Sequence, residues 1–228
     1  MERAVVIANG PSLKNVPNEW LDRFTTFGSN RVFLKYIPTY LAIVDVKMVW
    51  TAKLRKEAWK VFPQCKGVFL SDDVATFFKE PLPANVTVSP WRNYYDDDKK
   101  LMPVFSAQPD KALVSGGTVT YVLFQLALWK GFKDLLIVGL NHTFRDPRGD
   151  HFDPNYNANV GIPYERENTE DYGRGPGKWF WSEEGFVLKT NGFYGVALEH
   201  FTKIGGSIIN CTPDTKCPVF KIDDWRNY

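Results

Sequence analysis

Short polar segments follow apolar runs in this sequence, and they hold the residue types best able to do chemistry. The first is Asn9-Gly10-Pro11-Ser12, directly after the apolar run Ala4-Val5-Val6-Ile7-Ala8. An apolar run bounded by a Gly-Pro turn is typical of a buried parallel strand, and ligands bind at the carboxyl ends of such strands. The Asn9 side chain can both donate and accept hydrogen bonds, so it suits a base, a ribose or a phosphate. The alternative is that it holds the turn through an Asx hydrogen bond. Ser12 is placed to cap the following segment.

Two further expected strands also end in polar residues. Ser29-Asn30-Arg31 follows one of them, and Asp45 ends the run Tyr40-Leu41-Ala42-Ile43-Val44. We expect these ends to meet at one edge of the sheet, because ligands of open α/β sheets bind in that crevice. The candidate donor-binding residues of the first three strands are Asn9, Gly10, Ser12, Asn30, Arg31 and Asp45.

A second kind of binding element is the small-residue segment Ser115-Gly116-Gly117-Thr118, which opens an expected helix running to about residue 130. Free N–H groups and the positive end of a helix dipole suit a phosphate. The alternative is that Ser115 is only the N-cap of this helix. The sequence contains neither G-x-G-x-x-G nor G-x-x-x-x-G-K-[ST], so a glycine cradle of either kind is excluded.

Three histidines are the candidates for a general base near neutral pH. His142 follows the expected strand 134–139 and Asn141, which is a further candidate donor-binding residue. His151 lies farther along, in a loop, and is the favoured base, with His142 as the second candidate. His200 ends the last expected helix and is better explained as a partner of the helix dipole.

Residues 143–182 contain no clear helix or strand pattern, and a long insertion of this kind is typical of a lid or a binding loop. Its arginines and tyrosines suit an anionic substrate. The candidate donor-binding residues within it are Tyr156, Tyr164 and Arg166.

Apolar runs and helical spacings alternate along the chain. The expected strands are 4–8, 25–30, 40–45, 67–71, 86–88, 134–139 and 207–211. The expected helices are 47–60, 115 to about 130, and one from Ser182 or Glu183 to about Lys203. Alternation of this kind predicts one α/β domain over 1–228, a Rossmann-like three-layer sandwich with a mostly parallel sheet and a lid over about 143–182.

Composition limits the class of protein. A net charge of +2 over 228 residues gives no sign of a polybasic surface for nucleic acid or membrane. Three cysteines form neither a disulfide framework nor a zinc ribbon, which favours a reducing compartment. The sequence enters a strand at its start, without a signal-peptide pattern, and no apolar run reaches the ~18 residues of a membrane span. We therefore expect a cytoplasmic protein.

Several of these motifs together resemble a known family. Asn9-Gly10-Pro11-Ser12-Leu13 is similar to the opening turn of bacterial sialyltransferases that use CMP-activated sugars. A closer resemblance is to the family linked to lipopolysaccharide biosynthesis and to an archaeal 6-hydroxymethylpterin diphosphokinase. That resemblance is carried by Ser29-Asn30-Arg31, Gly116-Gly117-Thr118-Val119-Thr120, Gly139-Leu140-Asn141-His142 and His151-Phe152.

The resemblance to sialyltransferases implies a metal-independent transfer without a cofactor, with a nucleotide-sugar as co-substrate. It implies that Asn9, Ser12, Asn30, Ser115 and Gly116 hold the donor and that lid tyrosines bind its phosphate. The late histidine base of those enzymes is missing here, since the corresponding segment is Leu188-Lys189-Thr190-Asn191-Gly192. Asn141 stands where the family has an acidic residue.

Three functions remain open on this basis. The first is a glycosyltransferase that moves a sugar from a nucleotide donor, with a pyrimidine nucleotide favoured, to a saccharide, a glycolipid precursor, a protein or a modified nucleic acid. The second is a pterin diphosphokinase that uses ATP and magnesium, with Asp45, Asp72 and Asp73 as oxygen ligands. The third is a nucleotide-binding module without catalytic activity.

Overall fold

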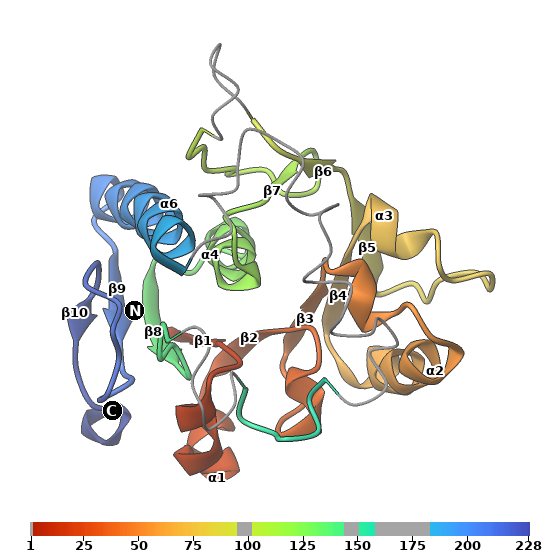
Figure 1. The fold of residues 1–228 in the computed structure, drawn as a ribbon, viewed down its shortest axis with the longest axis horizontal. Coiled ribbons are helices and arrows are strands. Elements are labelled where there is room, and N and C mark those ends of the chain that lie inside the picture. The colour runs from red at the N-terminus through yellow and green to blue at the C-terminus, as the bar shows by residue number, and fades with distance from the viewer. Residues whose placement is uncertain (1, 95–101, 144–150, 158–182) are drawn as a thin grey trace.

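An eight-stranded sheet forms the centre of the computed structural model, which describes residues 2–94, 102–143, 151–157 and 183–228, apart from the side chains of 183–186 (Figure 1). The strand order is β10-β9-β8-β1-β2-β3-β4-β5, and every pairing described for this sheet is parallel. The strands are β1 Ala4–Ile7, β2 Thr25–Ser29, β3 Tyr40–Ile43, β4 Gly67–Ser71, β5 Val86–Ser89, β8 Asp134–Val138, β9 Ser207–Asn210 and β10 Lys221–Ile222. The predicted α/β fold with a mostly parallel sheet is confirmed.

The strand order reverses direction at β1. From β1 the chain builds outward through β2, β3, β4 and β5, and it later returns to add β8 on the opposite edge of β1. Ala4 is therefore the register partner of Thr25 on one side and of Leu135 on the other. Such a reversal opens a crevice beyond the carboxyl ends of the two adjacent strands.

Helices cover both faces of the sheet (Figure 1). Val6 packs in the cluster on the face of α4 (Val119–Trp129) and α6 (Glu183–Lys203). Val5 packs in the cluster on the other face, with α1 (Asn18–Leu21) and α2 (Ala52–Val61). Both side chains are fully buried, as expected for alternate residues of a central parallel strand.

The expected helix over 47–60 begins later than predicted. Residues Val46–Met48 form a 3-10 turn, and α2 starts at Ala52 because the Thr51 hydroxyl accepts a hydrogen bond from the Leu54 N–H at 3.2 Å. The apolar residues before Thr51 mimic the helical spacing without belonging to the helix. The last expected helix is confirmed as α6, which runs over Glu183–Lys203 and so takes the second of the two starts that were open.

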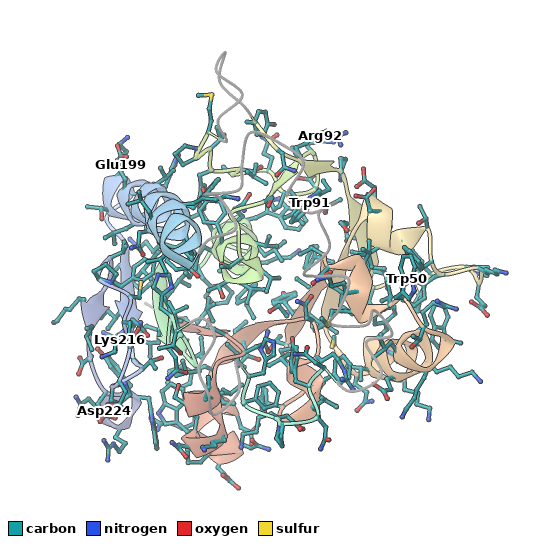
Figure 2. The ribbon with its side chains drawn as sticks, in the orientation of Figure 1. Trp50, Trp91, Arg92, Glu199, Lys216 and Asp224 are labelled. Atoms are coloured by element: carbon teal, nitrogen blue, oxygen red, sulfur yellow. The ribbon has the colours of Figure 1, made fainter. Side chains whose placement is uncertain are left out.

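Smaller elements complete the fold. A helical turn, α3 (Asp72–Ala75), follows β4, and two short strands, β6 (Trp91–Arg92) and β7 (Leu113–Val114), form a separate parallel pair. These two strands and β10 were not predicted, since two residues carry no readable pattern. Figure 2 shows Arg92 and Glu199 at the rim of the molecule.

Within the described part of the chain, no helix has the length and apolar composition needed to cross a membrane.

Candidate functional site

A cleft of about 310 Å³ lies at the carboxyl ends of β1, β2, β3 and β8. This volume is at the lower end of the range of small-molecule sites. The described residues that line it are Ala8, Asn9, Gly10, Pro11, Asn30, Asp45, Met48, Thr118, Val119, Thr120, Gly139, Leu140, Asn141, His142, Thr143, His151, Tyr156 and Tyr194. It occupies the position that the reversal of strand order predicts.

The tips of β1 and β8 approach each other closely at the cleft. A Cβ on Gly10 would lie 2.4 Å from the Gly139 carbonyl oxygen, and a Cβ on Gly139 would lie 2.4 Å from that of Ala8. The Asn141 carboxamide oxygen then accepts hydrogen bonds from the Ser12 N–H at 3.0 Å and the Ser12 hydroxyl at 2.8 Å. Ser12 therefore ties the ends of the two strands together from outside the cleft lining, and its side chain does not cap a helix.

Two carboxamide groups contribute buried acceptor atoms. Asn9 donates from Nδ2 to the Ser29 carbonyl at 3.3 Å and to the Ser29 hydroxyl at 3.1 Å, which fixes its orientation without an Asx turn. Asn30 is 7% exposed and has a φ of +52°, and its N–H donates to the Ala42 carbonyl at 2.7 Å. Among the residues that the structure describes, neither Asn9 Oδ1 nor Asn30 Oδ1 has a hydrogen-bond partner. A buried unpaired acceptor is costly, so these oxygens are suited to donors of a ligand.

The first turn of α4 forms another wall of the cleft. Its N-cap is Thr118, and no side-chain hydrogen bond from the described residues caps it, because the Thr118 hydroxyl is paired with the Tyr194 hydroxyl at 2.9 Å. The alternative that Ser115 is the N-cap is therefore wrong. The Thr118 side chain therefore leaves this helix start uncapped, and the start keeps its positive dipole end, while the Tyr121 N–H donates to the Thr118 carbonyl at 3.1 Å.

Ser115, Gly116 and Gly117 support this wall from outside the cleft lining. A Cβ on Gly116 would lie 2.2 Å from two Tyr121 side-chain carbons, so only glycine fits there. Gly117 has a φ of +78°, a conformation that favours glycine. These three residues shape the turn that positions Thr118, Val119 and Thr120.

His142 lies between β8 and α6. It is 7% exposed with a φ of +56°, and its ring centroid lies 5.8 Å from that of Tyr194. Burial lowers the pKa of His142 below 6.5, although the Asn191 side chain acts in the opposite direction. His142 is therefore neutral at pH 7 and can accept a proton.

His151 reaches the cleft from a short segment of the expected lid. The Phe152 N–H donates to the Asn9 carbonyl at 3.1 Å, which fixes this segment to the end of β1. The His151 ring stacks on Tyr156, with the centroids 3.9 Å apart. Burial raises the pKa of the Tyr156 hydroxyl, so this phenol stays protonated at neutral pH. His151 and His142 thus line the same cleft.

Arg31 holds this segment from behind and does not line the cleft. Its guanidinium donates to the carbonyls of Asn155 and Tyr156, and it forms an ion pair with Glu57 of α2 at 2.9 Å. The Arg31 N–H also donates to the Tyr156 hydroxyl at 3.3 Å. The structure therefore shows Arg31 as an anchor for Tyr156, in contrast to its expected place among the donor-binding residues.

The aspartates of the magnesium alternative are not brought together at the cleft. Asp45 lines it, and its Oδ1 accepts from the Lys47 N–H at 3.0 Å. Asp72 begins α3, where its Oδ1 accepts from the Trp91 N–H at 2.9 Å, and Asp73 follows it outside the cleft lining. In the described ranges, no three histidine, cysteine or acidic side chains gather as a metal site.

The structure therefore brings together eight of the expected site residues: Asn9, Gly10, Asn30, Asp45, Asn141, His142, His151 and Tyr156. Tyr164 and Arg166 lie outside the described residues, as does most of the expected lid. Tyr194 lines the cleft without having been predicted, because it lies inside a long helix and has no local sequence signal. Thr118 and Thr120 were not predicted as site residues either, although both belong to the glycine-rich motif that starts α4.

Comparisons with known proteins add no relative to this picture: no family model, no curated protein and no solved structure matches the chain.

Proposed function

We propose that this chain is a glycosyltransferase that moves a sugar from a nucleotide donor to an acceptor hydroxyl, without a metal. The proposal is carried by two features that line the same cleft: the side-chain oxygens of Asn9 and Asn30, and the first turn of α4. The carboxamide oxygens of Asn9 and Asn30, which have no hydrogen-bond partner among the described residues, suit the N–H and O–H donors of a nucleoside. The uncapped start of α4 suits the phosphate attached to that nucleoside.

The two histidines supply the base that such a transfer needs. His151 removes the proton of the acceptor hydroxyl, and the acceptor oxygen forms a bond to the anomeric carbon of the sugar. The bond between that carbon and the phosphate oxygen breaks, and the nucleotide leaves with the electron pair. N–H groups at the start of α4 stabilise the negative charge that develops on the phosphate. His142 is the alternative base.

A pyrimidine nucleotide is the favoured donor, on the resemblance of the strand-end motifs to those of CMP-sugar enzymes. The acceptor is a saccharide, a glycolipid precursor, a protein or a modified nucleic acid. The cytoplasm is the compartment we favour, since Cys65, Cys211 and Cys217 are all free thiols.

Thermal unfolding in the presence of CMP, CDP, UDP, GDP and ATP tests the proposal. A nucleotide at a hundredfold excess over its Kd adds about 2.7 kcal/mol to the free energy of unfolding. We expect CMP or another pyrimidine nucleotide to give the largest shift. If none of the five nucleotides raises the Tm, the transferase proposal is overturned.

A pterin diphosphokinase is the second candidate, favoured by the Asp45 carboxylate in the cleft. EDTA separates the two reactions: sugar transfer persists in its presence, whereas diphosphate transfer from ATP requires magnesium. Nucleotide binding without hydrolysis of any nucleotide-sugar would instead identify a binding module.

A further inference from the structure

Helix α6 contacts Gly117, the last residue of the turn Ser115-Gly116-Gly117 that precedes the N-cap of α4. A Cβ on Gly117 would lie 3.4 Å from Lys189 Cε and 3.6 Å from Thr190 Oγ1. Thr190 is fully buried, whereas Lys189 is partly buried. The end of the Lys189 side chain therefore lies against the residue that precedes Thr118, the N-cap of α4 at the cleft.

Lys189 contributes positive charge where the helix start already favours an anion. Burial lowers the pKa of Lys189 to about 8, so most of it is charged at pH 7. Among the residues that the structure describes, the other titratable groups near this junction include Tyr121 of α4, Tyr194 of α6 and His142 after β8. Burial raises the pKa of both tyrosines and lowers that of His142, so all three are neutral between pH 7 and 9.

An independent observation indicates that a ligand belongs in this cleft. Asn30 is 7% exposed and lines the cleft, and its Oδ1 has no hydrogen-bond partner among the described residues. Asn9 Oδ1, just after the adjacent strand β1, likewise has no hydrogen-bond partner among the described residues. These acceptor oxygens and the start of α4 line one cavity. A ligand that donates hydrogen bonds at one end and carries negative charge at the other would therefore fit both the acceptor oxygens and the helix start.

Building on the nucleotide-sugar function proposed above, we infer that Lys189 and the start of α4 form the subsite for the donor's phosphate. Lys189 binds the phosphate as a compact charge, and the α4 N–H groups bind it through hydrogen bonds. During transfer the same lysine stabilises the charge of the departing nucleotide. Asn9 and Asn30 bind the nucleoside, so the role of Lys189 is separable from theirs.

Isothermal titration calorimetry on the full chain tests this subsite with three probes: CMP, the uncharged nucleoside cytidine, and inorganic pyrophosphate. Lys189→Met is expected to weaken CMP and pyrophosphate at least tenfold at pH 7 and to leave cytidine unchanged. The matched control is Lys203→Met, on the same helix, where the lysine is exposed and pairs with Glu199 at 2.6 Å. This control should bind all three probes as the unaltered chain does.

The pH dependence provides a readout that a merely structural role would not change. A group with a pKa near 8 is about nine-tenths charged at pH 7 and about one-tenth charged at pH 9, so CMP affinity should fall about tenfold over this range. Lys189→Arg should remove most of this fall, because arginine stays charged. The phosphate itself has its second pKa at about 6 and adds little above pH 7.

The outcomes separate this inference from the proposed function. Unchanged CMP affinity in Lys189→Met overturns the subsite, while the proposed function stands. Loss of pyrophosphate binding in Lys189→Met, in a chain that does not bind CMP, supports the subsite and overturns the pyrimidine nucleotide. A chain that binds none of the three probes overturns the subsite, and the proposed function falls with it only if none of CMP, CDP, UDP, GDP and ATP raises the Tm.

Discussion

The Asn141 carboxamide oxygen accepts two hydrogen bonds from Ser12, at 3.0 Å from its nitrogen and 2.8 Å from its hydroxyl, across a sequence separation of 129 residues. This contact joins the end of β8 to the turn after β1, where the two strands meet at the cleft. The contact uses only an acceptor oxygen, which the uncharged Asn141 side chain supplies.

Asn141→Ala should therefore lower the free energy of unfolding by about 1–3 kcal/mol, because it leaves the Ser12 N–H without its partner. Asn141→Asp retains the acceptor and should lose much less. Urea unfolding of the two variants measures the difference. Equal losses in both would show that the Ser12 contact adds little stability.

Close approach at the strand ends predicts a large effect at Gly139. This residue has a φ of +74°, and a Cβ on it would lie 2.4 Å from the Ala8 carbonyl oxygen. Gly205 is the matched control, with a φ of +70° and nothing within 4 Å of a Cβ. Gly205→Ala should cost about 1–2 kcal/mol for its backbone conformation alone. Gly139→Ala should cost clearly more by urea unfolding; similar costs would exclude a role for the close approach.

The Arg31 anchor predicts a local effect on residues 151–157. Arg31→Gln removes the ion pair with Glu57 and at least one of the two carbonyl contacts, so amide hydrogen exchange in 151–157 should become faster. Stability should fall by about 1.5–3 kcal/mol, the usual value for hydrogen bonds to a charged group. Arg92→Gln is the control, since its ion pair with Asp72 spans 3.6 Å between half-exposed side chains. It should change stability by less than about 1 kcal/mol.

His151 should matter for turnover more than for donor binding. A positioned general base contributes about 10²–10⁴-fold in rate, so His151→Ala should lower kcat by that factor and leave nucleotide affinity nearly intact. His142→Ala is the comparison, because burial beside Tyr194 makes a loss of stability or donor affinity more prominent there. If His151→Ala keeps wild-type turnover and His142→Ala loses it, His142 is the general base and His151 is not.

His142 also predicts a pH dependence of stability. Its folded-state pKa lies below the ordinary value of 6.5 because burial disfavours the charged form. The unfolded chain therefore binds a proton more readily, and stability falls as the pH drops from about 6.5 through the lower folded-state pKa. His142→Gln should flatten the unfolding free energy between pH 7.5 and 5. The same slope in the variant would assign the acid sensitivity to another group.

The longer strands were predictable from the sequence, because most of them, such as β1, β3, β4 and β8, are short apolar runs followed by polar residues. The polar ends identified much of the cleft for the same reason, since parallel strands bring their carboxyl ends to one edge. The role of Arg31 was not predictable, since its partner Tyr156 lies 125 residues away. Tyr194 was hidden because a buried aromatic in a helix looks the same whether it faces a core or a cleft.

The central position of β1 in the sheet also has a consequence during translation, because its two neighbouring strands are synthesised far apart in time. Ala4–Ile7 is fully buried in the finished sheet, with β2 on one edge and β8 on the other. Until Asp134–Val138 leaves the ribosome, the growing chain holds β1 with one open edge, and unpaired strand edges invite association with other chains. A nascent chain halted before residue 134 of 228 would therefore leave one edge unpaired on a strand that is fully buried in the finished sheet.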